Sequence, residues 1–180
     1  MRTVSRARDA VSCRQNKMKN IFIIMGVAGS GKTTVGKKLA AAWGVPFFDA
    51  DDFHSDENRK KMQAGVPLVD GERAPWLQKL NQVLRQQSGT VVLACSALKA
   101  QYREMLHSEL VGGIQWICLE GDRDLIAQRI ALRQGHYMAP DMLPSQYQIL
   151  EPPTDAWTFN VRHSVDEIVQ SIVESCRISR

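Results

Sequence analysis

A glycine-rich segment that follows a short apolar run constrains this chain more than any other part of its sequence. Residues 26–34 read GVAGSGKTT and come directly after the run NIFIIM at residues 20–25. The segment matches the pattern G-x-x-x-x-G-K-[ST] without a gap. Glycines let backbone N–H groups curve around an anion, and a helix that begins directly after them adds its positive N-terminal end. The segment therefore predicts a buried strand, a phosphate-binding loop and a helix in direct succession.

The residues of this loop have distinct expected tasks. Lys32 can reach the β- and γ-phosphates of a nucleotide, and Thr33 offers a hydroxyl to Mg²⁺. The guanine signal N-K-x-D is missing, because the pair Asn16-Lys17 lacks an acid two residues further on, so ATP is favoured over GTP. We expect the nucleotide to bind through Gly26, Val27, Ala28, Gly29, Ser30, Gly31, Lys32, Thr33 and Thr34.

Apolar runs and amphipathic segments alternate along the whole chain. Further strands are expected at 45–49, 90–98, 114–121 and 157–161, and helices at 32–43, 55–64, 76–84, 99–110, 123–133 and 164–178. Such alternation predicts a parallel sheet that is covered by helices on both faces. The expected fold is therefore α/β: a three-layer P-loop NTPase fold with a five-stranded parallel sheet and a small lid.

Three connecting segments carry their own expectations. Residues 134–146, QGHYMAPDMLPSQ, contain glycine and two prolines without clean periodicity, so they are expected to form a mobile loop or lid. Residues 64–75 are rich in turn residues and are expected to be irregular. Asp122 is expected to cap the helix that follows it, because a short acid accepts the free N–H groups of a first turn.

The net charge of +4 belongs to the N-terminal end of the chain. Residues 1–17 hold five basic residues and one acid, which leaves 18 of each sign in residues 18–180. We expect 1–17 to be a basic, disordered extension, although an Arg-rich, acid-poor segment also weakly resembles a transit segment. Residues 18–180 are expected to form a single domain.

Composition also limits the classes of partner that the protein is expected to bind and the cellular compartment in which it is expected to work. A neutral folded part argues against a nucleic-acid partner, and no apolar run approaches the roughly 18 residues that a membrane span needs. The four cysteines are scattered without a CxxC pair that would suggest zinc. Cys95 and Cys118 stand in apolar runs and are expected to be small buried residues, and a reducing, cytoplasmic compartment fits best.

A phosphoryl donor also needs an acceptor, and FFDADDFH at residues 47–54 supplies a candidate site. Asp49 and Asp51 come at the end of a predicted strand, in the crevice where open α/β sheets bind ligands. Side chains two apart point the same way in an extended chain, so one acid could face a metal and the other a substrate hydroxyl. A solvated acidic turn is the other interpretation. Polar residues that would suit a small anionic acceptor recur in loops: His54, Asp70, Arg73, Lys99 and Arg103.

Five segments in this order and spacing resemble the gluconokinases, small P-loop kinases that stand alongside shikimate kinase. The segments are GVAGSGKTT, DADDFH, DGERAPWL, CSALKAQYR and RIALRQGHYM, and the resemblance covers about residues 20–151. It implies transfer of a phosphoryl group from ATP, with Mg²⁺, to the 6-hydroxyl of D-gluconate, which gives 6-phospho-D-gluconate. It also suggests a homodimer.

The resemblance implies roles by position. Thr33 and Asp49 would support Mg²⁺, and Asp51 would orient and deprotonate the attacking hydroxyl, although the two acids could exchange roles. Arg129 and Arg133, one helical turn apart, would neutralise charge that develops during transfer. Catalysis would fall to Lys32, Asp51, Arg129 and Arg133, and the gluconate pocket would be lined by Asp51, His54, Arg73, Lys99 and Arg103, with His136 in the closing lid.

Two alternatives stay open at this point. The chain could be a P-loop kinase for another small hydroxy-acid such as shikimate. It could also be a nucleotide-dependent binding switch, which the missing guanine signal and the acidic crevice disfavour.

Overall fold

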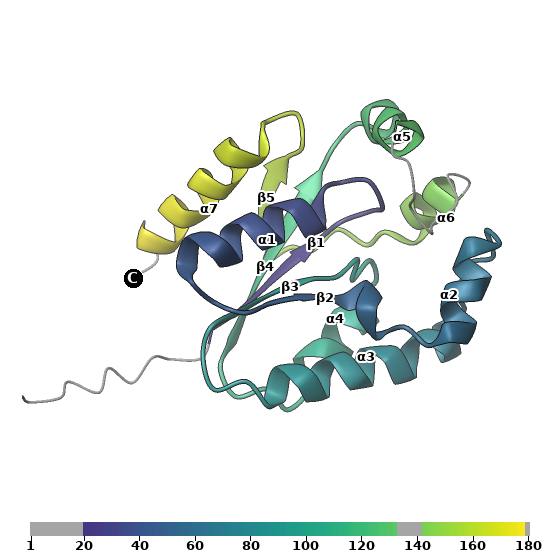
Figure 1. Ribbon diagram of the computed structural model, residues 1–180, viewed down its shortest axis with the longest axis horizontal. Coiled ribbons are helices and arrows are strands. Elements are labelled where there is room, and N and C mark those ends of the chain that lie inside the picture. Colours follow the sequence, from purple (N-terminus) through teal and green to yellow (C-terminus); the bar gives the residue numbers. More distant parts are fainter. Residues whose placement is uncertain (1–19, 133–141, 179–180) are drawn as a thin grey trace, which may run out of the picture.

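A five-stranded sheet forms the centre of the fold (Figure 1), in a computed structural model that describes residues 20–132 and 142–178. The strands are β1 (Asn20–Met25), β2 (Phe47–Asp49), β3 (Val91–Ala94), β4 (Gly113–Glu120) and β5 (Trp157–Asn160). Their order in the sheet is β2-β3-β1-β4-β5, and every neighbouring pair is parallel. The carboxyl ends of all five strands therefore meet at one edge, which confirms the parallel sheet predicted from the sequence.

Helices cover both faces of this sheet and make three layers. Figure 1 shows α1 (Lys32–Trp43) and α7 (Val165–Ile178) on one side, and α3 (Asp70–Arg85) and α4 (Ala100–His107) on the other. The other helical elements are the 3₁₀ turn η1 (Ala50–Phe53), α2 (Asp56–Gln63), α5 (Arg123–Ala131) and α6 (Met142–Ile149). No helix in the described part of the chain is long and apolar enough to cross a membrane.

The strand β1 is apolar on both sides because both of its faces are buried. Ile21 and Ile23 pack in the cluster that contains the inner residues of α3 and α4, whereas Phe22 and Ile24 pack with those of α1 and α7. This explains why the strand reads as a continuous apolar run and not as an alternating one. Leu77 of α3 is fully buried, and a buried side chain of this size contributes roughly 1.5–3 kcal/mol.

The helix α3 begins six residues earlier than the sequence predicts. Its start at Asp70 lies inside the segment 64–75 that was expected to be irregular. The Oε2 atom of Glu72 accepts a hydrogen bond from the backbone N–H of Val69 at 3.0 Å, which stabilises the first turn. Pro75 lacks the N–H that would bond the carbonyl of Gly71, but Gly71 is exposed, so water can take that bond.

The expectation of a loop over residues 134–146 is wrong at its C-terminal end. Residues 142–146 belong to α6, and Pro144 lies in its first turn, where a missing N–H costs no helical hydrogen bond. The rest of the predicted lid and the extension 1–17 lie outside the described residues. The strands at 45–49 and 90–98 are also shorter than predicted, because only residues 47–49 and 91–94 of these segments form strands.

The predicted cap of α5 is wrong as well. Asp122 stands at the N-cap position, but its side chain makes no capping hydrogen bond. Its carboxylate pairs with the guanidinium of Arg162, which follows β5. A charged partner across the sheet edge has thus replaced the local interaction that the sequence suggested.

Candidate active site

The phosphate loop, residues 26–33, curves between β1 and α1 as its glycines predict. Gly29 and Gly31 have φ angles of 77° and 95°, which a residue with a side chain rarely adopts. A Cβ atom on Gly29 would lie 2.6 Å from the Cγ1 atom of Ile130 in α5. The helix α5 is therefore packed directly against this loop, and no larger residue fits at position 29.

Two side chains of the phosphate loop are held by named partners. The Nζ atom of Lys32 donates to the carbonyl oxygen of Val27 at 2.9 Å, so the ammonium group lies across its own loop. The Oγ1 atom of Thr33 donates to the Oδ2 atom of Asp49 at 2.7 Å. The Oδ1 atom of Asp49 accepts from the backbone N–H of Asp51 at 3.1 Å. Asp49 therefore joins the phosphate loop to the start of η1, and the predicted acid pair lies beside the loop.

Thr33 and Asp49 offer the oxygen donors that Mg²⁺ prefers. In the described residues there is no group of three or more His, Cys, Asp or Glu side chains that could hold a metal ion. Mg²⁺ in phosphoryl-transfer sites is usually held by one or two carboxylates together with substrate phosphates and water. The hydroxyl of Thr33 and the carboxylate of Asp49 are oxygen donors that fit an ion held in this way.

Charged side chains from α3 and α4 meet on the acceptor side of the sheet edge. The Nζ atom of Lys99 lies 2.9 and 2.8 Å from the two carboxylate oxygens of Asp70. Gln101 donates to the same carboxylate at 2.9 Å, and the hydroxyl of Tyr102 donates to it as well. These donors, with Lys99 first, hold the pKa of Asp70 well below its usual range, and the bond to Asp70 raises the pKa of Lys99.

The two arginines predicted for the acceptor pocket are both anchored to backbone carbonyl groups. Arg73 donates to the carbonyl oxygen of Leu68, and its guanidinium lies 5.5 Å from the ring centre of Tyr102. The Nη1 atom of Arg103 reaches the carbonyl oxygens of Ala97, Leu98 and Glu151 at 3.0, 3.3 and 3.1 Å. The structure therefore brings Arg73, Lys99 and Arg103 to one region around the start of α4.

His54 is buried beneath this region and not open to solvent. Its ring stacks on Trp76 with centroids 4.2 Å apart and planes 14° apart, and 8% of the residue is exposed. Burial, and then the positive charges of Arg73 and Arg59, lower the pKa of His54 to about 4. The imidazole is neutral at neutral pH, so it can offer an uncharged hydrogen-bonding nitrogen to a substrate but no positive charge.

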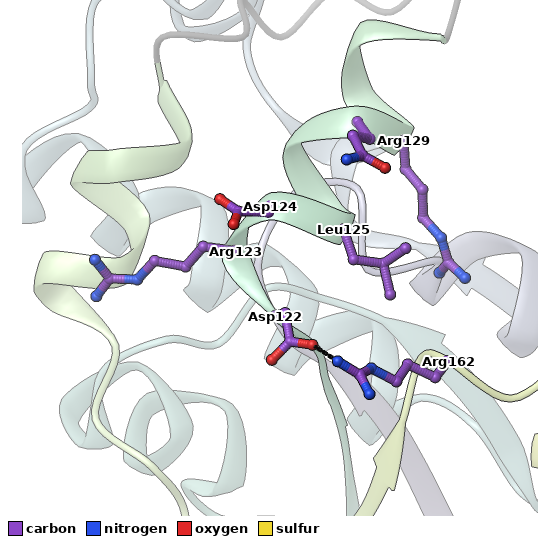
Figure 2. A pocket seen from close by; sticks show the side chains of 7 residues that line it. Asp122, Arg123, Asp124, Leu125, Arg129 and Arg162 are labelled. Carbon is purple, nitrogen blue, oxygen red and sulfur yellow. Dashed lines mark hydrogen bonds and ion pairs between the residues drawn. The ribbon is translucent and has the colours of Figure 1, made fainter.

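A cavity lies beside α5, near the start of that helix (Figure 2). Its volume is about 770 Å³. Arg129, which the sequence places near the phosphates, donates from Nη2 to the carbonyl oxygen of Val161 at 2.6 Å. The cavity is lined by Asp122, Arg123, Asp124, Leu125, Gln128, Arg129 and Arg162.

Several of these residues could not be selected from the sequence. Arg162 can be assigned to this site only once β4 and β5 are known to be neighbouring strands, because its partner Asp122 lies 40 residues away in the sequence. Gln146 belongs to a segment that the sequence predicts to be a loop, yet it is buried in α6 and contacts the phosphate loop. Arg133 and His136, predicted for the phosphates and the lid, lie outside the described residues.

Comparison with known proteins gives independent evidence for the family to which this chain belongs. A family model described as "Shikimate kinase" matches residues 28–176. A mouse protein named "Probable gluconokinase" is 41% identical over an alignment that covers 87% of this chain and 97% of that protein. The chain belongs to the gluconokinase family. A member named "Probable gluconokinase" from Dictyostelium discoideum is 39% identical over 88% of this chain and 86% of its own length.

A solved structure supports the same family and the fold. The gluconokinase from Sinorhizobium meliloti has a TM-score of 0.78 with this chain at 34% identity, and the match covers 91% of this chain and 98% of that chain. The chain is therefore a kinase with a P-loop kinase fold, which implies the use of a nucleotide, ATP.

Proposed function

We propose that this chain catalyses the ATP-dependent phosphorylation of D-gluconate on its 6-hydroxyl, which gives 6-phospho-D-gluconate. Relatives named gluconokinases, about 40% identical over most of the chain, support this substrate. The observation that carries the proposal is the hydrogen bond between Thr33 and Asp49. It brings an acid pair at the end of β2 against a complete phosphate loop, as a transfer from ATP to an alcohol requires.

On the donor side, backbone N–H groups of residues 29–33 bind the β- and γ-phosphates, and Lys32 moves from the Val27 carbonyl to these oxygens. Thr33 and Asp49 hold Mg²⁺, which neutralises phosphate charge when it is bound. The cavity beside α5 takes the base and ribose of ATP, because Leu125 offers an apolar surface next to the loop-packed face of the helix. Arg129 and Arg133 then neutralise the charge that develops in transfer.

On the acceptor side, Asp51 orients the 6-hydroxyl and accepts its proton. The bond from its backbone N–H to Asp49 fixes the start of η1, which supports a fixed position for this carboxylate. Arg73, Lys99 and Arg103 attract the gluconate carboxylate, while neutral His54 bonds a hydroxyl. The ammonium group of Lys99 is already paired with the carboxylate of Asp70, so a substrate carboxylate that binds Lys99 joins an existing network of charged groups.

Further parts of the proposal rest on the resemblance. The kinase domain comprises residues 18–180. The enzyme works as a homodimer in the cytoplasm. Cys95 and Cys118 are buried thiols that form no disulfide, which is compatible with a reducing compartment.

A substrate panel tests the function directly. The purified full chain is assayed for ADP release with ATP and Mg²⁺ against D-gluconate, shikimate, D-glucitol and D-glucose, with Lys32→Ala as the control for a contaminating kinase. We expect turnover with gluconate far above that with D-glucitol, which shares the hydroxyls at C2–C6 but has an alcohol in place of the carboxylate. Strong turnover with shikimate and none with gluconate would favour the other kinase. Nucleotide binding without transfer to any acceptor would favour a binding switch.

A further inference from the structure

Helix α6 presents a buried polar side chain to the phosphate loop. The Oε1 atom of Gln146 accepts a hydrogen bond from the backbone N–H of Ala28 at 2.6 Å, across 118 residues of sequence. Gln146 is 8% exposed, although its neighbour in the same helix, Gln148, is exposed. A buried amide of this kind is costly unless its polar atoms are bonded, so the contact with Ala28 fixes the side chain against the loop.

The contact acts on a peptide group that Lys32 also touches. The carbonyl of Val27 and the N–H of Ala28 belong to one planar peptide unit. Its oxygen accepts from the Nζ atom of Lys32 at 2.9 Å, and its N–H donates to Gln146. Gln146 therefore fixes the orientation of the peptide on which the Lys32 ammonium group rests. The same carbonyl also accepts from the backbone N–H of Ser30 at 3.3 Å, so a chain without Gln146 loses one of the three hydrogen bonds that orient this peptide.

The segment that carries Gln146 is itself anchored on both sides of the site. On the donor side, the hydroxyl of Tyr147 donates to the carbonyl oxygen of Gly121 at 3.3 Å. The guanidinium of Arg123 lies 4.7 Å from the ring centre of Tyr147. Two residues after α6, the backbone N–H of Glu151 donates to the carbonyl oxygen of Leu98 at 2.8 Å, next to the start of α4. A side chain on such a segment has little freedom to move away from the loop.

We propose that Gln146 is a positioning residue for phosphoryl transfer, which acts on the nucleotide through the Val27–Ala28 peptide and Lys32. This inference rests on the proposed kinase function, but it concerns the nucleotide half of the site and does not depend on the acceptor. Gln146 holds the N–H of Ala28 toward α6. The loop then keeps one shape, with its other N–H groups turned to the phosphates and Lys32 in reach of them.

Amide hydrogen exchange and nucleotide binding test the proposal without any acceptor. Gln146→Leu removes the acceptor atom, Gln146→Glu keeps a carboxylate oxygen in its place, and Gln148→Leu is the matched control on the same helix. In the nucleotide-free full chain, the Ala28 amide is expected to be protected in the wild type, Gln146→Glu and Gln148→Leu, and to exchange faster in Gln146→Leu. Equal exchange of this amide in the wild type and Gln146→Leu would overturn the contact.

Calorimetry with a non-hydrolysable ATP analogue and Mg²⁺ measures the consequence. We expect Gln146→Leu to raise the Kd about fivefold to tenfold, as for the loss of one hydrogen bond, with Gln148→Leu within about twofold of the wild type. In a Lys32→Ala background the same substitution is expected to change the Kd by less than about twofold, because its effect passes through Lys32. An unchanged Kd with a lower Tm, or full additivity with Lys32→Ala, would mean that Gln146 only supports packing. Gln146→Met repeats the measurement if Gln146→Leu does not fold.

Discussion

The hydroxyl of Thr33 donates a hydrogen bond to the Oδ2 atom of Asp49 at 2.7 Å, although the two residues follow strands that are not neighbours. Thr33 lies in the first turn of α1, which follows β1 through the phosphate loop, and Asp49 ends β2, while β3 runs between these two strands in the sheet. The contact therefore spans the carboxyl end of β3. It joins the part of the site that binds phosphate to the part that carries the acid pair.

We expect Thr33→Ala and Asp49→Asn each to raise the Mg²⁺ concentration needed for half-maximal turnover, by a factor on the order of ten, because each removes one oxygen donor. The double variant should be less impaired than the product of the two single effects, since the residues share one ion. The measurement is a Mg²⁺ titration at saturating ATP and gluconate. Thr158→Ala, an exposed threonine on β5, is the control. A Mg²⁺ dependence that neither variant alters would remove both residues from the metal site.

Lys32→Ala should nearly abolish turnover while the protein still folds. The ammonium group rests on the Val27 carbonyl in a half-buried position, so its loss removes one hydrogen bond, worth about 0.5–1.5 kcal/mol, and no part of the apolar core. Thermal unfolding followed by circular dichroism should therefore show a small change in Tm. Substantial remaining kinase activity would contradict the role of Lys32 in holding phosphate.

Asp51→Asn should lower kcat by a factor on the order of 10² to 10⁴, the usual range for loss of a general base. The amide preserves the shape of the side chain, so the KM for gluconate should change much less than kcat. Steady-state kinetics with gluconate measure both constants. Asp52→Asn is the matched control, because Asp52 is the exposed next residue of η1. Wild-type kcat in Asp51→Asn would show that another group accepts the proton.

The sequence was sufficient for the first part of the fold and for the loop that binds phosphate. Residues 20–43 form a strand, a glycine loop and a helix with the predicted bounds, because both the apolar pattern and the glycine spacing are local signals. The same holds for the position of Asp49 and Asp51, since a strand that ends in an acid can be read without knowledge of its neighbours.

Contacts between segments that are distant in the sequence could not be predicted from the sequence. Pro75 and Pro144 suggest irregular chain, yet both lie inside helices. At Pro75 the packing of α3 in the core outweighs the cost of a missing N–H, and Pro144 lies in the first turn of α6, where a missing N–H costs no helical hydrogen bond. The contact of Gln146 with Ala28 depends on how α6 returns to the phosphate loop, and no local pattern encodes that path. At Asp122 the local signal is misleading: the sequence predicts a helix cap, but the carboxylate pairs with the distant Arg162.

The buried imidazole of His54 should make the stability of the protein depend on pH. The pKa of His54 is lowered from its ordinary value of 6.5 to about 4 in the folded state, because burial beside Trp76 disfavours the charged form. Between these values the unfolded chain binds more protons than the folded one. The free energy of unfolding is therefore highest above pH 6.5 and falls as the pH drops toward 4, by roughly 2–4 kcal/mol from this residue.

The substitution His54→Phe isolates this contribution, since phenylalanine keeps a ring for the stack on Trp76 but cannot take up a proton. Urea unfolding at pH values from 7 to 4.5 should show a shallower loss of stability in His54→Phe than in the wild type. Carboxylates such as Asp70 also lose stabilising bonds as the pH falls, so the difference between the two proteins is the quantity that matters. His107→Gln, an exposed histidine at the end of α4, should keep the wild-type slope. Parallel curves for wild type and His54→Phe would mean that His54 takes up its proton as easily in the folded protein as in the unfolded chain.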